Sequence, residues 1–264
     1  MLSFTENTAT WAALFAAAAV AGAAATPMSR VSVSFGAAPA AQATIAGTVA
    51  AAAAGVAIQP AATVARLATA PVVQRPLSEQ ALRQQMKFET VRWGGKPVRT
   101  LDEASRLLLA KAAAQHAGLH EVGLSFHDVY GVIDAETSWI PRTGSSKDGT
   151  PNLGLAQFEP RTAKGLGVKD PGDPVQAVFG AAKYMRQGAT WAADRLAALK
   201  LPPAQHAAKV REGVSVFYNL SVKGRNKWDG LNSAKLPVET QRHIRNAREG
   251  AAEAAQLARR LLRA

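Results

Sequence analysis

The sequence predicts a mainly α-helical fold, and three observations favour this class. Apolar residues recur at helical spacing in successive stretches from about residue 77 to the end of the chain. No long stretch alternates apolar and polar residues as a half-buried strand does, and no internal repeat is present. With 264 residues, the chain is long enough for one good-sized domain with extensions.

The periodic stretches define the expected helices. The first starts at Leu101-Asp102 and stops at Gly118, and the second is ended by Pro141. The segment 142–152 is rich in Gly, Ser and Asp and predicts a loop, followed by a short β element near 153–158. The expected helices are 101–118, 126–139, 160–166, 174–187, 189–199, 204–219 and 238–263.

The N-terminal region has a different composition from the rest. Its first 65 residues carry only Glu6 and Arg30, so nearly all of the net charge of +12 lies downstream. The apolar run 11–25 has the length of a signal peptide but lacks a basic segment before it, and the Ala-rich run 43–65 is long enough to span a bilayer. An export signal with a linker, a weak membrane anchor and a low-complexity arm remain alternatives, and we favour export or membrane association.

The positive net charge favours an anionic partner: a nucleic acid, a membrane surface or an acidic cell-wall polymer. A basic solvated face without a partner is the alternative. No aromatic-basic or helix-turn-helix pattern is present, so we expect no nucleic-acid binding. The chain has no cysteine, which excludes a disulfide framework and a thiol nucleophile. His116 and His120 have a metal-compatible spacing but belong to no HExxH pattern, so we expect no metal.

Glu136 is the acidic residue whose position says most about function. Val129, Val132 and Ile133 precede it at the spacing that places all four residues on one face of the expected helix. A carboxylate among apolar side chains is costly to ionise, and a protonated Glu beside a polar loop can serve as a general acid. The alternative is a Glu that reaches solvent or pairs with a basic residue of the segment 142–152.

Two further segments offer groups typical of sugar recognition. The segment 152–163 predicts a tight Gly turn that exposes backbone groups along a cleft edge, and Gln157 adds a neutral amide. Tyr218 and Asn219 end an apolar helix, where the Tyr hydroxyl could bond Glu136 or a substrate. An ordinary loop-to-helix junction and a core tyrosine are the alternatives.

Five short motifs follow one another between about residues 120 and 250. They are Glu136-Thr137-Ser138-Trp139-Ile140-Pro141; Gly154-Leu155-Ala156-Gln157-Phe158 with Pro160 and Thr162-Ala163; Asp173-Pro174 with Tyr184-Met185-Arg186; Phe217-Tyr218-Asn219-Leu220-Ser221; and Leu236-Pro237-Val238-Glu239-Thr240. In this order they resemble the catalytic domain of the soluble-type lytic transglycosylases, relatives of goose-type lysozyme.

The chain departs from the pattern of this family at positions that concern substrate contacts rather than the acid. Thr137 stands where the family has Ser and keeps the hydroxyl group. The other departures are Ala156 for Met, Ala177 for Asn, Leu220-Ser221 for Ala-Gly, and His243 for Tyr.

The resemblance implies a lysozyme-like helical catalytic domain that cleaves the glycan strands of peptidoglycan without a metal or cofactor. It implies that a single Glu, here Glu136, protonates the bond between N-acetylmuramic acid and N-acetylglucosamine and then acts as a base while a 1,6-anhydro ring closes. We expect Tyr218 to orient this acid. The substrate-binding residues that it implies are Thr137, Gly154, Leu155, Ala156, Gln157, Tyr218 and Asn219. A hydrolytic muramidase and a non-catalytic peptidoglycan-binding module are the alternative functions.

The resemblance also divides the chain. The expected parts are an Ala-rich, poorly structured or membrane-associated region at 1–70, a connecting helical region at 71–119, the catalytic domain at 120–250 and a basic helix end at 251–264. We expect a cell-envelope, periplasmic or exported protein whose N-terminal region contacts the membrane or an envelope apparatus. A phage virion or a secretion system is the alternative setting.

Overall fold

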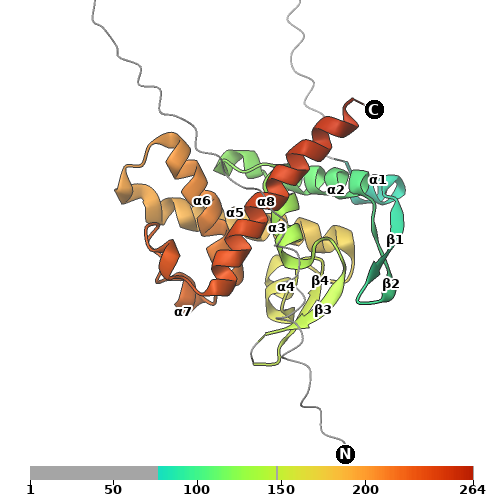
Figure 1. Cartoon of the computed structure of the whole chain (residues 1–264), viewed down its shortest axis with the longest axis horizontal. Helices are drawn as coiled ribbons and strands as arrows, with labels where there is room; N and C mark the ends of the chain where they lie inside the picture. The colour runs from blue at the N-terminus through green and yellow to red at the C-terminus, as the bar shows by residue number, and fades with distance from the viewer. Residues whose placement is uncertain (1–76, 147, 264) are drawn as a thin grey trace, which may run out of the picture. The chain divides into compact units, whose positions relative to one another are not determined.

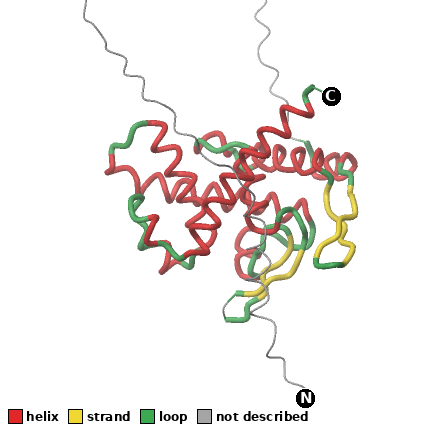
Figure 2. Tube along the Cα trace, in the orientation of Figure 1, coloured by secondary structure: helices red, strands yellow, loops and turns green. Residues whose placement is uncertain are grey.

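The computed structural model describes residues 77–146 and 148–263 (Figure 1). In this part helices predominate and the strands are few and short, which confirms the predicted fold class (Figure 2). The signal, anchor or linker expected at 1–70 lies outside the described residues. No helix in the described part is both long and apolar enough to cross a membrane.

Two antiparallel β-hairpins interrupt the succession of helices. In chain order the elements are α1 (Glu79–Gln85), β1 (Phe88–Trp93), β2 (Lys96–Leu101), α2 (Glu103–His116), η1 (Leu119–Val122), α3 (Phe126–Thr137), β3 (Arg142–Ser145), β4 (Pro151–Gly154), α4 (Pro160–Leu166), α5 (Pro174–Leu196), η2 (Ala197–Leu199), α6 (Pro203–Asn219), α7 (Val222–Arg225), η3 (Ser233–Lys235) and α8 (Val238–Leu261).

The first hairpin lies where the sequence analysis expected only helical structure. Strands β1 and β2 pair from Phe88 opposite Leu101 to Trp93 opposite Lys96, and Gly94-Gly95 forms the turn between them. Both glycines have positive φ, 55° and 78°, which a two-residue hairpin turn of the common type requires. The Gly-Gly pair between two β-rich segments was therefore a sequence signal that helical periodicity alone missed.

Helix α3 carries the residue on which the site depends. Its first turn is closed by a capping box in which the carboxylate of Asp128 accepts the backbone N–H of Ser125 at 2.7 Å. It ends at Thr137, before the expected residue 139, because Ser138 and Trp139 adopt left-handed φ values of 51° and 61°. This sharp end buries the Trp139 side chain completely and turns the chain toward β3.

The segment 142–152, predicted as a loop, contains most of the second hairpin. Strands β3 and β4 pair from Arg142 opposite Gly154 to Ser145 opposite Pro151. The β element expected near 153–158 is confirmed in part, since β4 ends at Gly154 and an isolated bridge joins Leu153 to Phe158. The residues of this hairpin are mostly polar or glycine, so they lack the alternation of apolar and polar residues that distinguishes a strand from a loop in the sequence.

The helices expected at 174–187 and 189–199 form one continuous helix, α5, followed by the short η2. Gly188, where the sequence predicted a break, lies inside α5 against Phe217 of α6. A Cβ built on Gly188 would lie only 3.2 Å from the Phe217 ring. This glycine therefore permits two helices to approach rather than ending one of them.

Helices α3 and α8 cross in direct contact, and Figure 1 shows α8 lying across α3. The crossing depends on two glycines. A Cβ on Gly131 would lie 2.1 Å from the carbonyl oxygen of Ala247, and a Cβ on Gly250 would lie 3.0 Å from the Cα of Gly131. This close approach brings side chains of α8 to the end of α3.

Candidate active site

Glu136 lies in the last turn of α3, on the face that points into the protein. Val129, Val132 and Ile133, which share this face, are almost completely buried, whereas the Glu136 side chain is 15% exposed. The inward orientation expected from the helical spacing is thus confirmed. The carboxyl group is largely enclosed and remains open to solvent on one side.

His243 of α8 is the hydrogen-bonding partner of the Glu136 carboxyl group. Its Nε2 lies 2.9 Å from Glu136 Oε1, and the His243 side chain is only 5% exposed. The other ring nitrogen, Nδ1, is buried and has no hydrogen-bonding partner among the described residues. In the sequence His243 stands out only as a departure from a family pattern, and helical spacing does not place it beside Glu136.

Arg142, the first residue of β3, holds the backbone at the end of α3. Its Nη2 donates to the carbonyl oxygen of Glu136 at 2.6 Å, and its Nη1 to that of Thr137 at 3.4 Å. Burial lowers the pKa of the Arg142 guanidinium, and the nearby Glu136 carboxylate partly opposes this effect. Arg142 therefore bonds the main chain of Glu136 and places a positive charge near its carboxyl group. The guanidinium also lies over the Trp93 ring, 5.5 Å from its centre.

The turn after β4 has the tight geometry that its glycine predicts. Gly154 has φ of +70°, and a Cβ there would lie 1.8 Å from the carbonyl oxygen of Pro171, so no other residue fits. Gln157 also has a positive φ, 48°, and its Nε2 donates to the carbonyl oxygens of Arg142 at 2.9 Å and Gly154 at 2.8 Å. Because both amide hydrogens are used within the protein, Gln157 holds the second hairpin closed.

Leu155 and Ala156, which lie in this turn, and Thr137, at the end of α3, are buried. The Thr137 hydroxyl, in a side chain that is 1% exposed, lies 3.0 Å from the carbonyl oxygen of Leu155 and 3.2 Å from that of Ile133. It therefore fastens the end of α3 to the turn. Their contact with a glycan remains a prediction, since their side chains point into the protein.

Tyr218, at the end of α6, belongs to the same network. Its hydroxyl donates to the carbonyl oxygen of Ala156 at 3.0 Å rather than to Glu136, and its ring is stacked on His243 at 6.0 Å between centres. Burial raises the pKa of Tyr218 well above its ordinary value, and the charge of Glu136 adds to this rise. The hydrogen bond that would orient Glu136 comes from His243, not from Tyr218 as the sequence analysis expected.

Asn219 is exposed, and its Oδ1 accepts a hydrogen bond from Thr240 Oγ1 at 2.7 Å. Thr240 lies one turn before His243 on α8. The structure thus gathers all the sequence-predicted site residues into one connected region formed by α3, the turn after β4, α6 and α8. Most of their polar groups bond one another, and Asn219 is the most exposed of them.

Other carboxylates lie apart from this network. Asp134 sits on a different face of α3, where burial and the charge of Glu253 raise its pKa to about 6. Glu159, just before α4, accepts a hydrogen bond from Ser146 Oγ at 2.8 Å, and Asp148 accepts one from the backbone N–H of Thr150. Among the described residues, no three His, Asp or Glu side chains gather as a metal site would require. The arrangement offers one acid able to give and take a proton.

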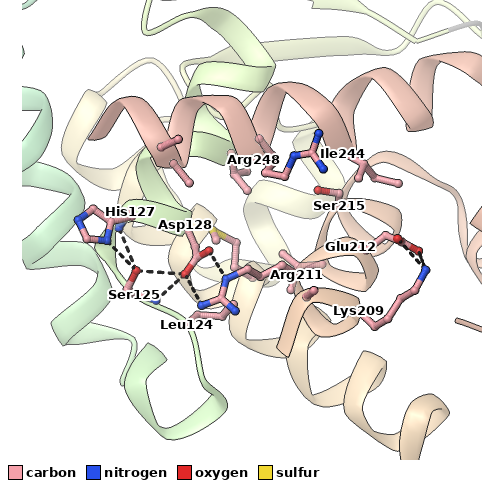
Figure 3. Close-up of a pocket in the computed structure, with 17 residues that line it drawn as sticks. Leu124, Ser125, His127, Asp128, Lys209, Arg211, Glu212, Ser215, Ile244 and Arg248 are labelled. Carbon is pink, nitrogen blue, oxygen red and sulfur yellow. Dashed lines mark hydrogen bonds and ion pairs between the residues drawn. The ribbon is translucent and has the colours of Figure 1, made fainter. Parts of the chain in front are cut away.

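A separate cavity of about 460 Å³ opens between the start of α3, α6 and α8 (Figure 3). Its wall includes Val132, Met185 and Ile244, and the ion pair of Asp128 with Arg211, 2.7 Å apart, lies at its edge. Glu136 does not line this cavity. The cavity is therefore distinct from the glycan cleft that the sequence predicts at the other end of α3.

Comparison with known proteins gives one partial similarity. The chain is 44% identical over 59 residues to a protein of Enterobacteria phage PRD1 that is named a transglycosylase. The similar stretch is 22% of this chain and 21% of that protein, so the chain spans about a fifth of the length of this relative. No protein-family model matches the chain. No solved structure matches it either.

Proposed function

We propose that this protein is a peptidoglycan lytic transglycosylase that cleaves the β-1,4 bond between N-acetylmuramic acid and N-acetylglucosamine. The observation that carries the proposal is the enclosure of Glu136, 15% exposed, between His243 and the main-chain contacts of Arg142. The similarity to the phage protein named a transglycosylase supports the same general class of activity.

In the first step, Glu136 gives its proton to the glycosidic oxygen, and the bond from this oxygen to C1 of N-acetylmuramic acid breaks. The carbonyl oxygen of the N-acetyl group on the same sugar bonds to C1, and the positive charge is then shared over the amide in a cyclic oxazolinium ion. No second protein carboxylate is required, in contrast to most glycosidases.

In the second step, the Glu136 carboxylate takes the proton of the 6-hydroxyl of N-acetylmuramic acid. The oxygen of this hydroxyl attacks C1 and displaces the N-acetyl oxygen, which closes the 1,6-anhydro ring. Glu136 is again protonated and no water is consumed. The positive charge of Arg142 near Glu136 stabilises the carboxylate that exists between the two steps.

The predicted glycan contacts come from the edges of the site. In this proposal the glycan contacts backbone N–H groups of the turn Gly154–Gln157 and the exposed side chain of Asn219. Thr137 and Tyr218 bond the carbonyl oxygens of Leu155 and Ala156 and hold the turn in place. A glycan strand is the partner that this proposal requires. The similar protein comes from a phage, and this favours a phage-associated setting for the present chain over a periplasmic one.

The test is digestion of purified murein with the full chain, followed by mass spectrometry. We expect anhydromuropeptides, which are lighter by one water than the products of a muramidase. Reducing-end products would instead indicate hydrolysis, and glycan retention without cleavage would indicate a binding module.

Glu136→Gln should abolish cleavage while leaving thermal unfolding unchanged, because the amide cannot give the proton. Glu159→Gln is the matched control, since Glu159 is a partly buried carboxylate that bonds Ser146 outside the network. Full activity of Glu136→Gln, or loss of activity in Glu159→Gln alone, would contradict the assignment.

A further inference from the structure

His243 is almost fully enclosed beside the proposed acid, and its two ring nitrogens have different surroundings. Nε2 lies 2.9 Å from Glu136 Oε1. Nδ1 is buried, and no residue in the described part of the chain forms a hydrogen bond with it. A proton on Nδ1 would be a buried donor with no acceptor, which is costly, so the proton of the neutral ring resides on Nε2.

We propose that His243 is a positioning residue that donates its Nε2 hydrogen to Oε1 of Glu136 and thereby assigns the acidic proton to Oε2. This inference rests on the proposed function of Glu136 as the acid. Oε1 is occupied as an acceptor, while Oε2 makes no hydrogen bond to the described residues and is not sealed from solvent. The proton that Glu136 transfers is therefore held on its open side.

The same asymmetry decides which of the two side chains carries the mobile proton. If the ring took it, an imidazolium would face an ionised Glu136, and its Nδ1–H would be a charged donor without an acceptor. If Glu136 keeps it, both groups are neutral and their hydrogen bond is retained. The second state is the form that can act as a general acid.

His243 is held rigidly in this orientation. Its ring is stacked on Tyr218, whose hydroxyl is bonded to the backbone of the turn after β4. The His243 side chain is only 5% exposed, less than that of Glu136 at 15%, so it acts through the carboxyl group rather than on the glycan.

The first experiment is nitrogen-15 NMR of the histidine side chains in the full chain at neutral pH, with the His243 signal identified by its absence in His243→Gln. We expect a neutral ring protonated on Nε2, and a displacement of its Nε2–H signal in Glu136→Gln. A ring protonated on Nδ1, or an imidazolium, would overturn the inference. This measurement needs no catalysis, so it decides the inference even if the chain fails to cleave murein.

The second experiment compares the kinetics of His243→Phe and His243→Gln on murein. Phe keeps a planar ring without a donor, and Gln restores an N–H donor that cannot be charged. We expect kcat to fall about 100-fold in His243→Phe with KM almost unchanged, because misorientation of an acid acts on the chemical step. We expect His243→Gln to recover most of this loss.

His127→Phe is the matched control. His127 is partly buried near the same pair of helices but belongs to the separate cavity, and its ring lies near Ser125 rather than Glu136. Its variant should cleave murein at nearly the normal rate. Wild-type kcat in His243→Phe, or equal losses in His243→Phe and His243→Gln, would contradict a positioning role.

Discussion

Gly131 of α3 and Gly250 of α8 lie face to face, and a Cβ on Gly250 would come within 3.0 Å of the Gly131 Cα. This contact sets the distance between the two helices. Because Glu136 and His243 lie on the same two helices, the glycine contact also determines whether these side chains meet. The distance between Glu136 and His243 therefore depends on how closely α3 and α8 pack.

Gly131→Ala should destabilise the protein by about 1–3 kcal/mol, because the added methyl group overlaps the backbone of Ala247. Urea unfolding measures this change, and murein cleavage should fall with it. Gly165→Ala is the control, since a Cβ on Gly165 in α4 meets nothing within 4 Å. Equal stability of the two variants would argue against a tight crossing of α3 and α8.

Asp134→Asn should stabilise the protein at neutral pH. Burial, aided by the charge of Glu253, raises the pKa of Asp134 from 3.8 to about 6. The folded state therefore binds the proton of the Asp134 carboxyl group more tightly than the unfolded state does. The stability that this proton contributes is fully present below about pH 4 and is lost as the pH rises through about 6. We expect Asp134→Asn to raise the free energy of unfolding by about 1 kcal/mol at pH 7.5, a value that allows for solvent screening of a partly exposed group. Near pH 4 the substitution should leave the free energy of unfolding unchanged.

Thermal unfolding across this pH range tests the effect of Asp134. Asp194→Asn, which changes an exposed carboxylate of α5, should leave the pH dependence of stability as it is in the wild type. A constant difference between Asp134→Asn and wild type at all pH values would show that ionisation of Asp134 is not its cause.

Thr137→Val removes the hydroxyl that links α3 to the carbonyl oxygen of Leu155 while keeping the side-chain shape. We expect a loss of about 1 kcal/mol in the free energy of unfolding, because one buried hydrogen bond is lost. Cleavage should fall as well, since the end of α3 and the turn are no longer fastened together. Thr137→Ser retains the hydroxyl and should remain close to wild type in both measurements.

Tyr218→Phe distinguishes two roles of the Tyr218 side chain. Its hydroxyl donates to Ala156 and its ring is stacked on His243. We therefore expect kcat to fall less than about 10-fold in Tyr218→Phe, which keeps the ring, and much further in Tyr218→Ala. Complete loss of cleavage in Tyr218→Phe, with the fold intact, would instead mean that the hydroxyl itself contacts Glu136 or the glycan during the reaction.

Local sequence features predicted much of the fold. The boundaries of α4 and, within one or two residues, those of α2, α3, α6 and α8 follow from caps, proline and apolar spacing. The first hairpin was missed because its strands are short and mostly exposed, and Gly188 was interpreted as a helix break because a close helix contact cannot be recognised from one helix alone. In each case the missing information was the identity of a distant packing partner.

The sequence by itself determined that Glu136 lies on the buried face of a helix, since helical spacing is a local property of neighbouring residues. It also grouped the predicted substrate-binding residues, which the structure brings into one region. Only the tertiary structure decided that His243, separated from Glu136 by 107 positions, is the partner of its carboxyl group. It likewise decided that Gln157 and Thr137 bond the protein backbone. The physical reason is that such pairings depend on where two helices cross, and two glycines set this crossing.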